Sequence, residues 1–173
     1  ASIDSITPNP ATKGSSVTFT GSGEDTDGSI TAYLWTEGSA QLSTEASFDT
    51  SDLAVGIHII SFKVQDNKGV WSDEVTTTLT VEAQNLAPTA SIVSPVSDTV
   101  VTVGSSVTFT GSGEDTDGSI TAYLWTEGSA QLSTEASFDT SDLAVGIHII
   151  SFKVQDNKGV WSDEVTTTLT VEA

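Results

Sequence analysis

Six aspartates in two matching groups are the residues of this sequence best suited to binding a ligand. In chain order they are Asp25, Asp27 and Asp66, followed by Asp115, Asp117 and Asp156. Ca²⁺ prefers hard oxygen ligands from carboxylates, amides and backbone carbonyls, and takes about 6 to 8 of them. The two groups therefore predict a calcium site in each half of the chain, provided that the fold brings each group together.

The same residues also fit a simpler role in tight turns. Asp25 and Asp27 belong to an Asp-x-Asp-Gly sequence, and aspartate side chains often accept hydrogen bonds from backbone N–H groups two residues further on. An EF-hand is excluded, because aligning Gly28 with the glycine of that loop places Leu34 where the bidentate glutamate belongs. A calcium site and a metal-free turn are the two alternatives for each group.

The two groups match because the chain contains the same 70 residues twice. Gly14–Ala83 and Gly104–Ala173 are identical, at an offset of 90 residues. Such a repeat indicates tandem units with one fold. The predicted domains are residues 1–83 and 89–173, joined by a short linker at 84–88. Because proline restricts the residue before it, the linker is predicted to be a semi-rigid joint.

Apolar and polar residues alternate through each repeat, which predicts β-strands with one buried face. In the first copy the predicted strands lie near residues 1–6, 16–20, 32–35, 46–48, 56–58, 60–64 and 75–81. About seven short strands in roughly 85 residues are typical of an immunoglobulin-like sandwich, which often buries a tryptophan of its third strand, here Trp35 or Trp125. The predicted fold class is all-β, as two tandem immunoglobulin-like β-sandwiches of seven strands each.

This fold would bring the aspartates of each group together. Its second-to-third loop and its sixth-to-seventh loop project from the end of the domain at which the chain arrives. In the second copy the linker arrives there as well. The side-chain amide of Asn85 and the backbone carbonyl of Leu86 are therefore predicted to join the second aspartate group as calcium ligands.

Three segments of the chain resemble those of PKD domains. Gly23–Trp35 resembles their Asp-x-Asp-Gly-x-Ile-x-x-Tyr-x-Trp sequence, and Phe62–Gly69 is similar to the Val-x-Asp-x-x-Gly sequence before their last strand. Asn85–Ala90 is similar to their usual N-terminal lead-in. In one departure, many PKD domains follow the tryptophan with Asp-Phe-Gly-Asp-Gly, whereas Thr36–Ser39 reads Thr-Glu-Gly-Ser, so properties of that acidic turn are not carried over.

The resemblance implies an extracellular or cell-surface sandwich of seven strands, of the PKD type and without catalytic activity. It implies a structural spacer in an adhesion array, with neighbouring repeats or other surface proteins as partners. The alternative is a carbohydrate- or protein-binding accessory module of a secreted hydrolase, with a polysaccharide as partner. Some PKD-like domains of secreted bacterial collagenases hold calcium in this region, which agrees with the prediction from the aspartates.

Composition limits the other partners. The chain has 24 acidic and 5 basic residues, and its net charge of −19 is spread over both copies. Such a surface repels nucleic acids and anionic membranes and attracts cations. No apolar run approaches the ~18 residues that span a bilayer. Because Ala1–Asp4 lacks the features of a signal peptide, we interpret the chain as a mature segment or a fragment.

The remaining reactive side chains predict no enzyme. His58 and His148 share the side-chain parity of core residues and are expected to cap the edge of each core. Trp71 and Trp161 are expected to cover the end of the core, with a sugar contact as the alternative. Four carboxylates could in principle supply an acid and base pair for glycoside hydrolysis, but a small sandwich lacks the deep cleft that this needs. They are Glu24, Glu37, Asp49 and Asp52.

Overall fold

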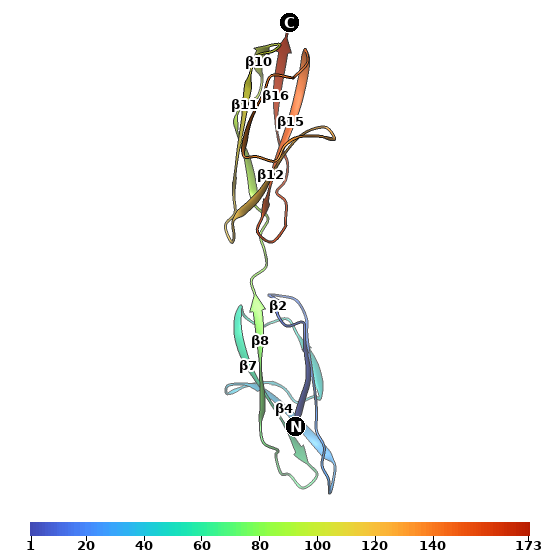
Figure 1. Cartoon of the computed structure of the whole chain (residues 1–173). Helices are drawn as coiled ribbons and strands as arrows, with labels where there is room; N and C mark the ends of the chain where they lie inside the picture. The colour runs from blue at the N-terminus through green and yellow to red at the C-terminus, as the bar shows by residue number, and fades with distance from the viewer. The chain divides into compact units, whose positions relative to one another are not determined.

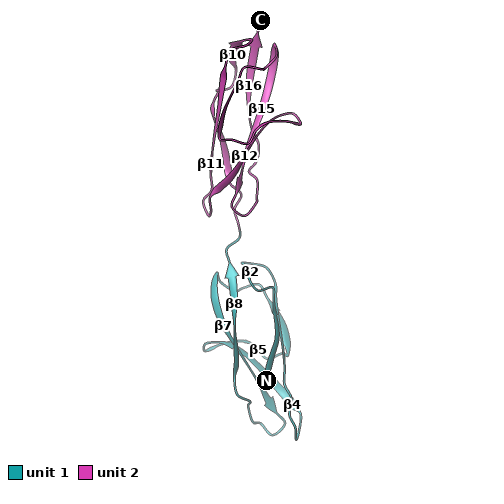
Figure 2. Ribbon diagram, in the orientation of Figure 1, with its two compact units in different colours: residues 1–84 teal, residues 85–173 magenta.

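The protein is built from two compact units of β-structure without a helix (Figure 1). The computed structural model describes all 173 residues, and it divides them into unit 1, Ala1–Gln84, and unit 2, Asn85–Ala173 (Figure 2). Each unit has a three-stranded and a five-stranded sheet, so the predicted all-β, immunoglobulin-like class is confirmed. Residues 85–88, which the sequence assigns to a linker, group with unit 2. No helix of the length and apolarity that a bilayer crossing needs is present.

Unit 1 contains eight strands. In chain order they are β1 (Ser2–Thr7), β2 (Ala11–Thr12), β3 (Val17–Ser22), β4 (Ile30–Glu37), β5 (Ala40–Ser43), β6 (Ser47–Thr50), β7 (Gly56–Asp66) and β8 (Val75–Glu82). One sheet has the order β1-β3-β6, and the other has the order β2-β8-β7-β4-β5. Neighbouring strands are antiparallel except β2 and β8, which are parallel.

Unit 2 repeats this topology. Its strands are β9 (Thr89–Ser94), β10 (Thr99–Thr102), β11 (Val107–Glu114), β12 (Ile120–Glu127), β13 (Ala130–Ser133), β14 (Ser137–Thr140), β15 (Gly146–Asp156) and β16 (Val165–Glu172). The sheet orders are β14-β11-β9 and β10-β16-β15-β12-β13, again with one parallel pair, β10 and β16. β10 is longer than its counterpart β2 because it lies in the part of the lead-in that differs between the copies.

The number of strands differs from the seven expected. The lead-in of each unit forms two strands, because the chain leaves the small sheet after β1 and then pairs with β8 in the large sheet. β5 was not predicted, since none of its four residues is fully buried and they carry no clear alternation. Two predicted strands near residues 56–58 and 60–64 are one continuous strand, β7, because the alternation passes through His58 without a turn.

The core of each unit is a cluster of aromatic rings between the two sheets. Trp35 is fully buried, which confirms the expectation for the third predicted strand. Its ring centroid lies 4.2 Å from that of Phe62 and 5.7 Å from that of Phe19. Its indole N–H donates to the Glu45 carbonyl at 3.0 Å, so the one polar atom of the ring is satisfied.

A glycine of β3 allows these rings to approach the small sheet. A Cβ on Gly21 would lie 2.7 Å from the ring of Phe62 and 2.8 Å from the ring of Trp35. A larger residue would have to displace two buried aromatic side chains. Gly21, which directly follows the residues predicted for the second strand, thus lies within β3 and has a packing role there.

Candidate metal site at the leading end

Two loops meet at the leading end of each unit, which we define as the end where its first strand begins. In unit 1 they are the β3–β4 loop and the β7–β8 loop. They meet because β4 begins where β7 ends, with Ile30 opposite Asp66. A backbone hydrogen bond of 2.9 Å from Asn67 N to Ser29 O joins them. The three aspartates predicted for each copy therefore lie at one end of each unit.

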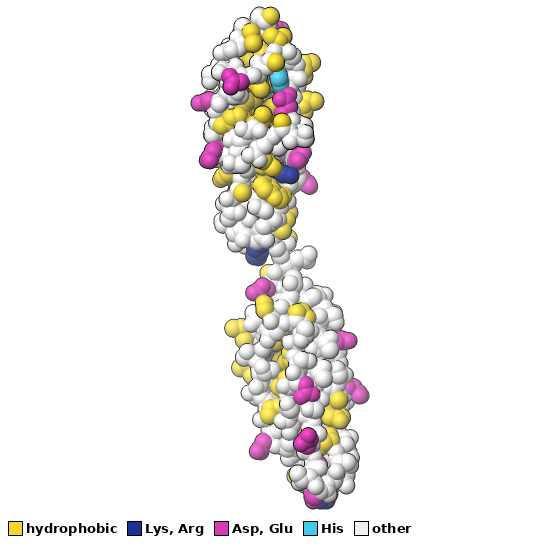
Figure 3. All heavy atoms as spheres, turned by 45° about the vertical axis from the view of Figure 1, so that its right-hand side comes forward, with side chains coloured by type: hydrophobic (Ala, Val, Ile, Leu, Met, Phe, Trp, Pro, Cys, Tyr) yellow, Lys and Arg dark blue, Asp and Glu magenta, His cyan; other side chains and the backbone are white.

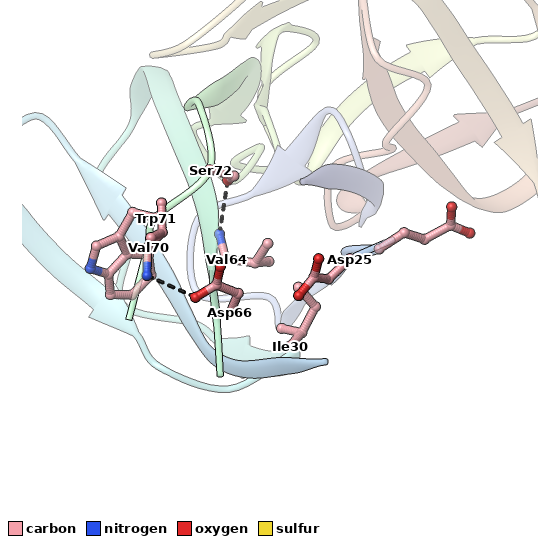
Figure 4. Close-up of a pocket in the computed structure, with 8 residues that line it drawn as sticks. Asp25, Ile30, Val64, Asp66, Val70, Trp71 and Ser72 are labelled. Carbon is pink, nitrogen blue, oxygen red and sulfur yellow. Dashed lines mark hydrogen bonds between the residues drawn. The ribbon is translucent and has the colours of Figure 1, made fainter. Parts of the chain in front are cut away.

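Part of this geometry is turn chemistry. Asp66 Oδ1 accepts hydrogen bonds from the backbone nitrogens of Lys68 and Val70, both at 2.8 Å, and Figure 4 shows this carboxylate turned toward Val70. Asp25 Oδ1 accepts from the backbone nitrogen of Asp27 at 3.2 Å. Unit 2 has the equivalent bonds. In Asp25 and Asp66 these bonds are accepted by Oδ1, so Oδ2 of each carboxylate takes no part in the turn.

In unit 2 the segment directly ahead of β9, which contains Asn85 and Leu86, binds two of the three aspartates. Asn85 Nδ2 donates to Asp156 Oδ2 at 2.7 Å, and Leu86 N donates to Asp117 Oδ1 at 3.3 Å. The bond from Asn85 is the main reason that the pKa of Asp156 lies below its usual value, and backbone N–H groups of the turn act in the same direction against the effect of burial. The sequence predicted Leu86 as a carbonyl ligand, whereas here it contributes its N–H.

Three buried oxygens at the leading ends have no hydrogen-bond partner. They are Oδ2 of Asp25, Oδ2 of Asp115 and Oδ1 of Asn85. Buried oxygens of this kind are uncommon in folded proteins, because an unpaired polar atom costs about 1 to 3 kcal/mol. Each is an acceptor, so a proton donor or a cation would satisfy it.

In each unit an asparagine side-chain oxygen lies close to the unpaired aspartate oxygen. A Cβ on Gly118 would overlap both Asp115 Oδ2 and Asn157 Oδ1, so these two oxygens face the same side of that glycine. Asn157 Oδ1 also accepts from Ser119 N at 3.0 Å. Gly28 of unit 1 stands in the same relation to the equivalent aspartate and asparagine. A side chain at either glycine would fill this space.

A lysine contacts the remaining aspartate in each unit. The ammonium of Lys68 contacts Asp27, and this contact is the main reason that the pKa of Asp27 is lowered, with Asp25 as the second cause. In unit 2 Lys158 Nζ lies 3.6 Å from Asp117 Oδ2. These lysines neutralise part of the negative charge of each group.

The structure brings together some of the predicted ligands. Asn85 meets Asp156, and Leu86 meets Asp117, as the common location of the loops implied. No three acidic or histidine side chains approach closely enough to hold a metal ion by themselves. Sequence reasoning missed Asn67, Asn157 and the lysines, although each asparagine directly follows the aspartate that ends β7 or β15, in an Asp-Asn-Lys sequence.

The other reactive side chains have structural partners. One face of Trp71 carries the ammonium of Lys63, 5.1 Å from the ring centroid, and Trp161 and Lys153 are paired in the same way at 5.4 Å. Asp49 accepts a hydrogen bond from Thr18 Oγ1 at 2.6 Å. The lysine on the ring occupies a face on which a sugar would stack.

His58 and His148 each lie between two acceptors at the edge of the core. His58 Nδ1 is 2.7 Å from Glu37 Oε1, and Nε2 is 2.8 Å from the Ala54 carbonyl oxygen. Neither partner can donate a proton, so both ring nitrogens are satisfied only in the imidazolium form. The Ala54 carbonyl, followed by Glu37, raises the pKa of His58 above its usual value, against the effect of burial. His148 has the same environment.

These histidines predict a fall in stability as the pH rises above the ordinary histidine pKa of about 6.5. A raised pKa in the folded state stabilises the protein below that value, and the contribution is lost as the pH rises through the folded pKa. Carboxylates are already ionised in this range. The urea concentration at the midpoint of unfolding should therefore be lower at pH 8 than at pH 6 for the natural chain. The double variant His58→Gln, His148→Gln should lose this slope, and an equal slope in both chains would contradict the assignment.

Comparisons with known proteins identify related sequences. No family model matches the chain. The chain is 31% identical over 160 residues to the pre-pro-metalloprotease PrtV of Vibrio cholerae, in two strains. The match includes 92% of this chain and 16% of PrtV, so the chain spans only a small part of that protein.

Among solved structures, two single domains match with comparable identity. The PKD1 domain of V. cholerae PrtV is 33% identical over 100% of its length and 51% of this chain, with a TM-score of 0.41. The PKD1 domain of Vibrio anguillarum Epp is 30% identical over 99% of its length and 52% of this chain, with a TM-score of 0.42. The fibronectin(III)-like modules of Clostridium thermocellum CbhA match 99% of this chain and 93% of their own at 16% identity and a TM-score of 0.50, a likeness of fold alone.

Proposed function

The chain belongs to the PKD domain family, as two domains in tandem, and on that premise we propose that it is a non-catalytic spacer of a larger extracellular or cell-surface protein. Its partners in this role are the neighbouring modules of the same polypeptide and other surface proteins. Two features support the proposal. The 70-residue repeat supplies two equal folded units, and each core is complete within its own unit, as a modular extender requires.

We extend the proposal to calcium at the leading end of unit 2. The oxygens that fit the ion are Asp115 Oδ2 and Asn85 Oδ1, which are buried without partners, and Asn157 Oδ1, which faces the same side of Gly118 as Asp115 Oδ2. Carboxylate and amide oxygens are the ligands that Ca²⁺ takes, with water completing its shell. The acidic surface of both units, on which Figure 3 shows few basic side chains, would favour a cation over an anion.

Calcium at this position would hold the preceding segment against unit 2. Asn85 belongs to that segment, whereas Asp115 and Asn157 belong to the two loops, so an ion shared among them would restrict the backbone ahead of β9. Unit 1 has the equivalent Asp25 and Asn67, and the position equivalent to Asn85 lies ahead of the 173 residues described. We therefore expect the 173-residue chain to bind calcium more tightly at unit 2 than at unit 1. The main support for this expectation is Asn85 Oδ1, which is buried without a hydrogen-bond partner.

Nuclear magnetic resonance of the whole chain tests the proposal at residues that occur once. Asn85 and Leu86 lie outside the identical repeat, so their amide signals are distinct from those of unit 1. Millimolar Ca²⁺ added after chelation should increase the heteronuclear NOE of both amides, because the ion orders this segment. Mg²⁺, which demands a smaller octahedral site, should have little effect.

Matched substitutions in the two units provide the control. Asp115→Asn should abolish the effect of calcium on Asn85 and Leu86, because it weakens the ligand set in unit 2. Asp25→Asn makes the same change in unit 1 and should leave those signals responsive. An unchanged response in Asp115→Asn, or an equal response to Mg²⁺, would contradict calcium binding by these residues. The spacer proposal would then stand without an ion.

A further inference from the structure

The leading end of unit 1 contains a pocket that is covered in unit 2. The pocket has a volume of about 170 Å³ and is lined by three carboxylates, including that of Glu24, together with apolar side chains and a tryptophan (Figure 4). Its principal lining residues are Asp25, Ile30, Val64, Asp66, Val70 and Trp71. Each of these residues has an identical counterpart in unit 2 at an offset of 90. Any difference between the two leading ends therefore comes from outside the repeat.

The residues of unit 2 are more buried than their counterparts. The Asp117 side chain is 25% exposed, compared with 72% for Asp27. Asp156 is 1% exposed, whereas Asp66 is partly exposed. Val160 is 41% exposed, compared with 63% for its counterpart in unit 1. The segment Asn85–Thr89 accounts for the lower exposure of the two carboxylates, since Asn85 contacts Asp156 and Leu86 contacts Asp117.

The contacts of that segment define what the pocket recognises. The side-chain amide of the first residue, Asn85, donates to the carboxylate that ends β15, and the N–H of the second donates to Asp117. The fourth residue, Pro88, is buried and lines a depression together with Trp161. An extended peptide with an asparagine, a free N–H at the next residue and a proline two residues later would make the same contacts in unit 1.

The direction of approach is also defined. β1 pairs with β3 through Ser2 and Ser22, in the same way as β9 pairs with β11 through Ser91 and Ser112. In unit 2 this pairing continues back to Thr89, opposite Glu114. In unit 1 β3 ends at Ser22, and the chain continues through Gly23 and Glu24, the counterparts of the two residues that extend β11. A peptide in line with β1 would follow these residues and reach the pocket.

We infer that the pocket of unit 1 is a docking site for an extended peptide of the Asn-Leu-Ala-Pro-Thr type, joined directly ahead of Ala1. The asparagine amide would bind the free Oδ2 of Asp66, the next N–H would bind Asp27, and the proline would cover Trp71. A module attached through such a peptide would be held to unit 1 by its leading-end loops. The contact needs no metal ion and is independent of the calcium proposal.

Grafting the segment onto the chain tests the inference. One variant carries Asn-Leu-Ala-Pro-Thr ahead of Ala1, a second carries Ala-Leu-Ala-Pro-Thr, and a third carries Gly-Ser-Gly-Ser-Gly. All three variants are produced with 5-fluorotryptophan in place of tryptophan and are studied in EDTA, which removes metal ions. The fluorine resonance of Trp71 is assigned as the one that disappears in Trp71→Phe. The asparagine graft should move the Trp71 resonance toward that of Trp161. It should also raise the melting temperature of unit 1 by about 4 to 8 °C over the Gly-Ser graft.

The asparagine should act through Asp66. The alanine graft should show a smaller rise, and Asp66→Asn should remove the difference between the asparagine and alanine grafts, even though this substitution also lowers the stability of the ungrafted chain. Equal melting temperatures and Trp71 resonances in the asparagine and Gly-Ser grafts would overturn the inference. So would an asparagine effect of the same size in the presence of Asp66→Asn.

Discussion

Replacing Trp125 by alanine is expected to lower the free energy of unfolding of unit 2 by about 3 to 5 kcal/mol. The ring is fully buried, and its centroid lies 4.3 Å from that of Phe152 and 5.7 Å from that of Phe109. The substitution leaves a cavity between the sheets. It also removes the indole N–H that donates to the Glu135 carbonyl at 3.0 Å, so a partly buried acceptor loses its partner.

Differential scanning calorimetry of the whole chain measures this effect. Unit 1 has its own core, so its transition should stay in place while the transition of unit 2 moves to a lower temperature. Trp161→Ala is the matched control, because that residue is only partly buried, outside the aromatic core, with Lys153 over one face, and its loss should cost clearly less than that of Trp125. A common shift of both transitions would show that the units do not unfold independently.

Much of the fold could be predicted from the sequence because its pattern is local. Val17 and Phe19 alternate with threonines, and they are buried on the inner face of β3 as the alternation requires. Trp35 could be assigned to the core because a tryptophan in the third strand of such a sandwich is usually buried. The identical repeat settled that the second unit would have the same fold as the first.

The strands that the sequence did not predict depend on pairing with other segments of the chain. β5 is short and has no fully buried residue, so it is a strand only because β4 lies beside it. The second strand of each lead-in exists because it finds an edge of the large sheet at β8 or β16. Neither signal is present in the residues of the strand itself, since β-propensity depends strongly on neighbours.

The candidate site was predictable to the level of which loops meet. The aspartates were placed at one end because loops between alternate strands of a sandwich share that end. Which oxygens remain free could not be predicted, because it depends on side-chain rotamers and on the turn that Asp66 caps. The roles of Asn157 and Lys158 likewise appear only when the two loops are placed together.

Calcium is expected to have the largest effect of any ligand, and it acts on unit 2 first. An ion that binds only the folded state adds about 2.7 kcal/mol of stability at 100 times its dissociation constant, which corresponds to a shift on the order of 10 °C for a unit of this size. The expected ligands at Asp115, Asn85 and Asn157 are brought together only when unit 2 is folded. Asp115→Asn should remove most of the shift, whereas Asp25→Asn should not.

We propose that this PKD pair is a spacer whose second domain is stiffened by calcium, and a thermal melt provides a direct test. The chain is melted after chelation, then with millimolar Ca²⁺, and then with the same concentration of Mg²⁺. We expect Ca²⁺ to raise the melting temperature of unit 2 selectively, and Mg²⁺ to leave it close to the chelated value. Coincident curves under all three conditions would contradict a calcium-stiffened spacer and would identify the aspartates as metal-free turns.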